Sequence, residues 1–226
     1  LLLLGHVLNT GKTSFHASTL AAHNGFVHQG AKCMVLCNEE SYERVAARYL
    51  SAVTSMSMDE IKTNMAVAAM RYDKVDKNIF VKDSTGKDMS WVEAIVKAYE
   101  PDIVVLDMGD KFAMGKGERT DLFLKEAAIH ARNIAKAHQC VIMWMSQLSA
   151  DAEGLIEPDQ SMLEGSKIGK AAEADLIIMV SKNKIVEGDD GAETQRHLKI
   201  AKNKLKGGSH ARVTCQLDGD RSQYLP

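Results

Sequence analysis

Short apolar segments alternate along this chain with longer segments of helical pattern. Each apolar segment is four to six residues long, and several contain no polar residue. Segments of this kind predict strands buried on both faces, as in a parallel sheet covered by helices. The alternation therefore predicts an α/β fold. The expected strands span residues 1–5, 32–37, 79–82, 103–106, 141–145 and 176–180, and the expected helices span residues 12–29, 43–50, 58–72, 91–99 and 122–138.

The C-terminal part of the chain follows a different pattern. Residues 197–202 and 212–217 alternate between polar and apolar side chains, and the stretch from Lys206 to Ser209 between them contains two glycines. Alternation by two around a glycine-containing turn is typical of a β-hairpin. We therefore expect an antiparallel hairpin at the edge of the sheet.

Composition limits the classes of protein to which the chain can belong. Its 226 residues are 45% hydrophobic, which suits one large domain with its own core. The net charge of -2 gives no global basic field that would indicate nucleic-acid binding, so any contact with nucleic acid must be local. No apolar run reaches the length of a membrane span. Because the chain opens inside an expected strand and lacks an initial methionine, we expect residues 1–226 to be a single domain of a longer polypeptide.

The cysteines form no C-x-x-C pair, and each lies inside or beside an apolar run. Buried free thiols of this kind are typical of a protein of the reducing cytosol, rather than of a disulfide or metal framework. The four cysteines are Cys33, Cys37, Cys140 and Cys215.

The stretch from Gly5 to Ser14, GHVLNTGKTS, directly follows the first expected strand. It matches the phosphate-binding pattern G-x-x-x-x-G-K-[ST] except that the first glycine comes one position early, so His6 stands in its place. In such a loop Lys12 reaches the β- and γ-phosphates, and the Thr13 hydroxyl binds magnesium. The residues expected to hold a nucleotide are His6, Asn9, Thr10, Gly11, Lys12, Thr13 and Ser14.

Three further polar positions follow expected strands. Asp107 ends the apolar run 103–106 and can hold the magnesium that Thr13 also serves. Glu39 or Glu40, after the second strand, can orient and deprotonate a water, or can merely cap the next helix. Gln147 comes two residues after the strand 141–145, where it can sense a γ-phosphate or simply lie at the surface.

Taken in order, these segments resemble the RecA-like motor domain of hexameric replicative DNA helicases, both the DnaB type and the helicase half of bacteriophage primase–helicases. The resemblance covers nearly the whole chain. It implies a RecA-like P-loop NTPase fold with a mainly parallel central sheet and a C-terminal antiparallel hairpin. The segments that carry it are Gly11-Lys12-Thr13, Asn38-Glu39-Glu40-Ser41, Val105-Leu106-Asp107, Met145-Ser146-Gln147, Ala174-Asp175-Leu176-Ile177 and Lys202-Asn203-Lys204, followed by Gly207-Gly208.

The resemblance also implies roles for individual residues. Glu39 becomes the catalytic carboxylate, Asp107 the acid beside the metal, and Gln147 the sensor of the γ-phosphate. The C-terminal hairpin, through Lys202 and Lys204, would reach the nucleotide of the neighbouring subunit.

The sequence departs from the family pattern at three places. His6 replaces a small residue at the start of the loop. Lys204 stands where the family commonly has an arginine finger, and lysine lacks the planar fork of arginine, so Arg212 is an alternative finger. The stretch after Gln147, where the family places a DNA-binding loop, is acidic and would repel a phosphate backbone. The candidates for DNA contact are instead Lys111, Lys116 and Arg119, although these can also belong to a plain solvated loop.

The function expected from these observations is an ATP-driven ring motor of the bacterial or phage-infected cytoplasm. It would use ATP and Mg²⁺, assemble as a homohexamer, translocate on single-stranded DNA, and work with a primase domain or protein. One alternative is another RecA-like DNA-dependent ATPase, a recombinase or repair protein that forms filaments. A second alternative is a nucleotide-binding assembly module with little turnover.

Overall fold

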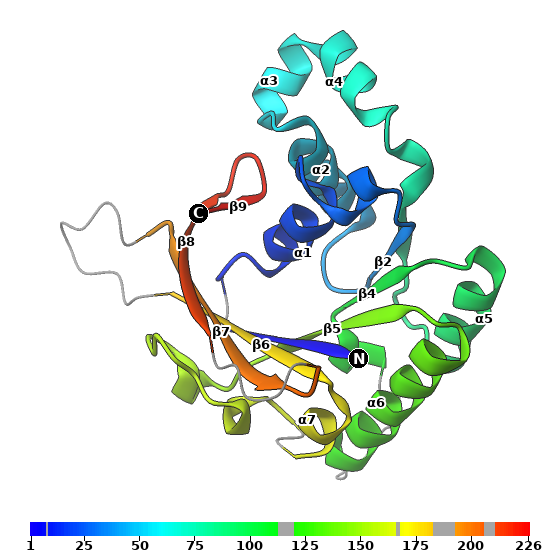
Figure 1. Ribbon diagram of the computed structural model, residues 1–226, viewed down its shortest axis with the longest axis vertical. Helices are drawn as coiled ribbons and strands as arrows, with labels where there is room; N and C mark the ends of the chain where they lie inside the picture. The colour runs from blue at the N-terminus through cyan, green and yellow to red at the C-terminus, as the bar shows by residue number, and fades with distance from the viewer. Residues whose placement is uncertain (8, 113–119, 166–167, 183–192, 206–210) are drawn as a thin grey trace.

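A nine-stranded mixed sheet forms the centre of the computed structural model, which describes residues 1–7, 9–112, 120–165, 168–182, 193–205 and 211–226 (Figure 1). The strand order is β3-β2-β4-β5-β1-β6-β7-β8-β9, and the first six strands in this order run parallel. The parallel strands are β1 (Leu2–His6), β2 (Cys33–Cys37), β3 (Ile79–Asp83), β4 (Ile103–Asp107), β5 (Val141–Gln147) and β6 (Leu176–Ser181).

Helices cover both faces of the parallel part, as the fully apolar strands predict. One core joins the sheet to α1 and α2, and the other joins it to α5 and α6 (Figure 1). Trp144 lies in the second core and Tyr49 in the first, and both are fully buried. The helices are α1 (Lys12–Ala21), α2 (Tyr42–Thr54), α3 (Met58–Thr63), α4 (Met65–Tyr72), α5 (Met89–Tyr99), α6 (Thr120–Ala137) and α7 (Gly169–Glu173).

One of the predicted helices ends earlier than its sequence pattern indicates, and another is interrupted. The helix predicted for residues 12–29 ends at Ala21, and a separate 3-10 turn, η1 (Phe26–Gln29), follows. Gly25 packs so closely on the Leu20 carbonyl that a β-carbon there would overlap it. The helix predicted for residues 58–72 is broken at Asn64, whose φ of -128° and ψ of 49° are not helical.

The C-terminal strands run antiparallel and extend the sheet further than predicted. β7 (Gln195–Asn203) pairs with β6 and with β8 (Arg212–Asp218), which confirms the hairpin. The hairpin is not at the edge, however, because β9 (Gln223–Leu225) pairs with β8 outside it. The expected free cysteines are confirmed, since all four are buried and unpaired. Within the described ranges, no helix has the length and apolar character that a membrane span requires.

Candidate nucleotide-binding site

The carboxyl ends of four neighbouring parallel strands bring the predicted site residues to one edge of the sheet. The loop after β1 carries Lys12, the segment after β2 carries Glu39, and β4 and β5 end at Asp107 and Gln147. In the order β2-β4-β5-β1, these strands lie side by side. Ligands of open α/β sheets bind at this edge.

A hollow of about 250 Å³ opens beside the loop after β1. Gly11 precedes α1 in the left-handed region, with φ 85° and ψ 40°, where glycine is favoured. The first turn of α1 contains no acidic residue, so its N-terminal N–H groups remain suited to an anion. The residues that line the hollow are His6, Asn9, Thr10, Gly11, Lys12, Thr13, Ser14, Glu39, Glu40 and Arg48. Of these, Arg48 had no sequence signal of its own.

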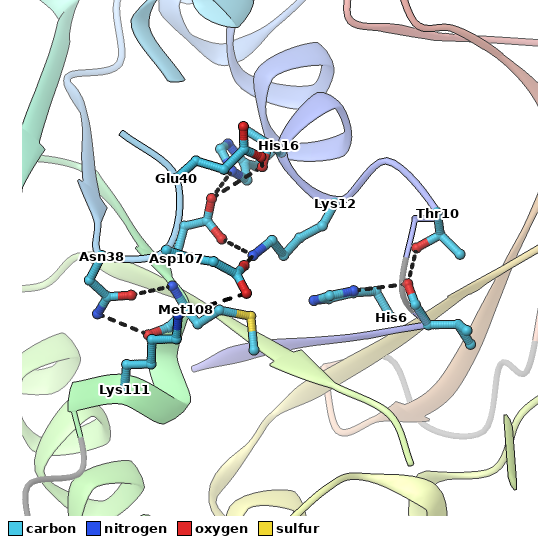
Figure 2. Close-up of polar contacts among 12 residues, drawn as sticks. His6, Thr10, Lys12, His16, Asn38, Glu40, Asp107, Met108 and Lys111 are labelled. Carbon is cyan, nitrogen blue, oxygen red and sulfur yellow. Dashed lines mark hydrogen bonds and ion pairs between the residues drawn. The ribbon is translucent and has the colours of Figure 1, made fainter. Parts of the chain in front are cut away.

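Lys12 lies between two carboxylates at the base of this hollow (Figure 2). Its ammonium is 2.6 Å from Asp107 Oδ1 and also pairs with Glu39. Burial alone would lower the pKa of Lys12, but the charges of Asp107 and Glu39 and the hydrogen bond to Glu39 outweigh it and leave the pKa raised. Lys12 is therefore a cation across the physiological range.

Asp107 is almost fully buried, at 1% exposure. Its Oδ2 accepts hydrogen bonds from the Thr13 hydroxyl at 3.3 Å and from His16 Nε2 at 3.2 Å. Burial favours the neutral acid, yet the hydrogen bond from His16 and the ion pair with Lys12 outweigh it. They hold the pKa of this carboxyl well below its usual range. Asp107 is therefore ionised, and its carboxylate can bind a cation.

His16 and Tyr49 form a support for Asp107 that sequence reasoning missed. His16 comes one helical turn after Lys12 on α1 and is fully buried. It donates from Nε2 to Asp107, and Nδ1 accepts from the Tyr49 hydroxyl at 2.8 Å. Burial raises the pKa of Tyr49 well above its ordinary value, so the phenol keeps its proton. The spacing of four residues from Lys12 was the one available signal.

The oxygen atoms around Thr13 fit a magnesium ion. The Thr13 hydroxyl lies 3.0 Å from Glu40 Oε1 as well as 3.3 Å from Asp107, and Asp107 Oδ1 is ion-paired with Lys12 without an aligned hydrogen-bond donor. Among the described residues, no group of three or more His, Cys, Asp and Glu side chains is placed to hold a metal alone. Magnesium at nucleotide sites typically takes one or two protein oxygens and completes its shell with phosphates and waters.

The two adjacent glutamates occupy different surroundings. Glu39 pairs with Lys12 and lies 3.8 Å from the ammonium of Lys111. Glu40 accepts from Thr13 and faces Arg48 at 3.6 Å. The structure therefore puts Glu39 beside the predicted phosphate-binding lysine and Glu40 beside the predicted metal ligand.

Asn38 joins the ends of β2 and β4 through its side-chain amide (Figure 2). Its Oδ1 accepts from the Met108 N–H at 2.7 Å, and its Nδ2 donates to the Met108 carbonyl at 3.2 Å. This pair of hydrogen bonds to one residue fixes the distance between the segment that carries Glu39 and the strand that carries Asp107.

His6 ends β1 and lines the hollow as a neutral side chain. Its Nδ1 is bonded to the Val7 carbonyl at 3.1 Å, and its buried Nε2 has no hydrogen-bond partner among the described residues. Burial and the neighbouring charge of Lys12 lower the pKa of His6 to about 4. His6 pairs in register with Gln147, so both face the same side of the sheet.

The C-terminal strands contact the loop after β1, which is predicted to bind phosphate, from outside. The Thr10 carbonyl accepts from Arg196 on β7 at 2.8 Å and from the Tyr224 hydroxyl on β9 at 2.8 Å. Tyr224 also reaches the Gly11 carbonyl at 3.3 Å and packs edge-on against Phe15. Loop carbonyls that would repel a phosphate are thus engaged by donors. Neither Arg196 nor Tyr224 could be assigned from the sequence.

Lys202 and Lys204 are not brought to this hollow. Both donate to the carbonyl of Ala172 near the end of α7, each at 3.3 Å. Lys202 pairs in register with Ile177 near the start of β6. It therefore lies at the amino ends of the parallel strands, at the opposite end of the sheet from the hollow. The alternative finger, Arg212, pairs with Glu157 at 2.5 Å.

The residues predicted to contact DNA are only partly described. Lys111 lies in the turn η3 (Gly109–Phe112) and faces Glu39. Lys116 and Arg119 lie outside the described residues.

A family model described as the DnaB-like helicase C terminal domain matches residues 1–225. The chain belongs to this family. The family membership and the fold expected from the sequence are thereby confirmed. The search of curated proteins found no significant match.

Two solved structures share the fold of this DnaB-like domain. One is described as an ATPase domain and superimposes with a TM-score of 0.84 at 15% identity, over 99% of this chain and 83% of that one. The other, a DnaB-like replicative helicase described with its interactions with primase, gives a TM-score of 0.84 at 16% identity. That match covers 99% of this chain and 56% of the helicase.

Proposed function

We propose that this DnaB-like domain is the ATP-hydrolysing motor of a ring-forming replicative helicase. The observation that carries the proposal is the convergence of Lys12, Thr13, Glu39 and Asp107 on one hollow at the carboxyl edge of the sheet. An ammonium, a hydroxyl and two carboxylates are the groups that a magnesium–triphosphate site needs. The family supports the same reaction.

Each of these side chains has a role in the proposed reaction. Lys12 would exchange its Glu39 partner for the β- and γ-phosphates, since a phosphate competes for the same ammonium. Glu39 is then free to orient a water and accept its proton. Thr13 and Asp107 would hold Mg²⁺, which when bound neutralises charge on the phosphates. His16 keeps Asp107 oriented, and Gln147 would respond to the γ-phosphate from the neighbouring strand.

Assembly into a ring gives Lys202 and Lys204 a role that their own subunit cannot provide. They lie at the end of the sheet opposite the hollow, out of reach of a nucleotide held there by their own subunit. This placement supports a homohexameric ring with nucleotide sites between subunits.

The proposal also specifies partners. Lys111, with Lys116 and Arg119, would contact single-stranded DNA along which the ring translocates. The replicative helicase that shares this fold is described with primase, and we extend that partner to this protein. We place residues 1–226 as the motor domain of a longer chain, acting in the bacterial or phage-infected cytoplasm.

Removing the ammonium of Lys12 tests the proposed reaction. Lys12→Ala should abolish ATP hydrolysis that single-stranded DNA stimulates in the parent protein, because the γ-phosphate loses its charged partner. Lys62→Ala is the matched control, since Lys62 is exposed and pairs with Asp59 on α3, away from the hollow. Turnover by Lys12→Ala at the rate of the control would contradict the proposal.

Particle shape separates the proposed motor from its nearest alternative. Electron microscopy of the protein with a non-hydrolysable ATP analogue and DNA should show closed six-fold rings. Open helical filaments would instead assign the chain to recombinase-like ATPases. Tight nucleotide binding without DNA-dependent turnover would assign it to the assembly modules.

A further inference from the structure

A fully buried lysine lies outside the hollow, among groups that the proposed reaction does not use. Lys170, on α7, has 0% exposure. Its ammonium donates to Asp110 Oδ1 at 2.9 Å, to the Ser146 hydroxyl at 2.7 Å and to the Glu164 carbonyl at 2.7 Å. An ammonium has three N–H donors, and each has a partner here.

Asp110 is the second centre of this cluster. Besides Lys170, it accepts from the Trp144 indole N–H at 2.8 Å and from the Ser146 hydroxyl at 2.8 Å. Gly109, the preceding residue, packs so closely on the Trp144 ring that a β-carbon there would overlap it. The turn η3 is therefore fixed to β5 by both packing and hydrogen bonds.

The cluster joins the segment after β4 to the end of β5, and both carry residues of the proposed site. Asp110 comes three residues after Asp107, and Ser146 directly precedes Gln147. The next residue after Asp110 is Lys111, whose ammonium lies 3.8 Å from Glu39 Oε1. Movement of η3 relative to β5 would therefore change the surroundings of both Glu39 and Gln147.

Stability alone is a weak reason for a buried ion pair, because desolvating two charges offsets most of their attraction. Buried polar groups of this kind fix one arrangement of the segments they connect. We propose that Lys170 is a positioning residue, which locks η3 to the end of β5 so that nucleotide at the hollow and DNA at Lys111 affect each other. This inference rests on the proposed function, since it takes the DNA contact of Lys111 from it.

The test measures coupling between the two ligands rather than activity. The affinity of the full-length protein for single-stranded DNA is measured with and without a non-hydrolysable ATP analogue. We expect the analogue to change the parent affinity at least about fivefold, as is typical of coupled sites. In the double variant Lys170→Met with Asp110→Asn, the change should fall below about twofold, while each ligand alone keeps its affinity.

The double variant is chosen because it removes both charges and leaves no unpaired buried ion. Its matched control is Lys62→Met with Asp59→Asn, which makes the same two changes in an exposed pair and should keep the parent coupling. A folded double variant with unchanged coupling would overturn the inference. If the double variant does not fold, Ser146→Ala carries the test, and undiminished coupling in that variant would overturn the inference equally.

The fluorescence of Trp144 gives a second readout, which would not respond to nucleotide if Lys170 had only a structural role. The chain has two tryptophans, so Trp91→Phe leaves Trp144 alone to report on η3. Its emission should respond to the analogue in this background and lose that response when Lys170→Met and Asp110→Asn are added. Parent protein that binds both ligands without coupling would overturn this inference alone. Parent protein that binds no nucleotide would overturn the proposed function as well.

Discussion

Local sequence patterns identify some of the side chains at the hollow and miss others. Lys12 and Thr13 belong to a contiguous loop, and Asp107 ends an apolar run, so all three could be singled out from local order. His16, Tyr49 and Arg48 could not, because only the folded chain brings them to the hollow and no local pattern marks them. Apart from its spacing from Lys12, nothing in the sequence distinguishes His16 from the other residues of α1. Its link to the site is visible only in the structure, where His16 Nε2 lies 3.2 Å from Asp107 Oδ2.

His6 makes the stability of the protein depend on pH. Its pKa is about 4 in the folded protein against 6.5 for a free imidazole. Between these values the unfolded chain binds a proton that the folded chain does not, so stability falls as pH falls from 6.5 to 4. The full loss is on the order of 3 kcal/mol. Chemical denaturation from pH 7 to 4 measures it.

His6→Gln should remove this part of the pH dependence, since glutamine does not titrate in that range. His23→Gln is the control, because His23 is exposed and should leave the dependence unchanged. The same slope in His6→Gln as in the parent protein would refute the assignment to His6.

At the scale of elements, the sequence predicts the parallel strands well because their apolar runs bury both faces. Helix ends are predicted poorly where tertiary contact decides them. Residues 12–29 carry a helical pattern, but the approach of Gly25 to Leu20 turns the chain after Ala21. β9 is only three residues long, too short to show an alternation, and its pairing with β8 became visible only in the structure.

The turn at Gly25 can be tested through stability. Gly25→Ala should destabilise the fold by about 1–3 kcal/mol, because a methyl group there meets backbone that cannot move aside. Gly219→Ala is the control, since a β-carbon at Gly219 has no neighbour within 4 Å. Thermal unfolding of both variants decides the point, and equal midpoints would show that Gly25 does not cause the helix to end.

β9 should contribute to nucleotide affinity through Tyr224. Tyr224→Phe removes the hydroxyl that bonds the carbonyls of Thr10 and Gly11 but keeps the ring against Phe15. We expect nucleotide affinity to fall by about fivefold, the equivalent of roughly 1 kcal/mol for one hydrogen bond. Tyr42→Phe, at an exposed tyrosine, is the control. Unchanged affinity in a titration of Tyr224→Phe would show that β9 does not hold the loop.

At the scale of the whole molecule, the sheet divides the proposed functions between its two edges. The hollow and its charged residues lie at the carboxyl edge of the parallel strands, and Lys202 and Lys204 lie at the opposite edge. This separation follows from the parallel arrangement of the strands, because the carboxyl ends of parallel strands all lie at the same end of the sheet. The order of motifs along the sequence predicts the shared edge, but the separation of the two lysines required the strand pairing.

The most direct test of the account is the structure of the assembled protein with Mg²⁺ and a non-hydrolysable ATP analogue, determined by electron cryomicroscopy. We predict triphosphate density in the hollow, with Lys12 against the β- and γ-phosphates and the metal between Thr13 and Asp107. We also predict Lys202 and Lys204 of each subunit against the nucleotide of its neighbour. Nucleotide density elsewhere on the subunit, with Lys12 still paired to Glu39 and Asp107, would contradict the account.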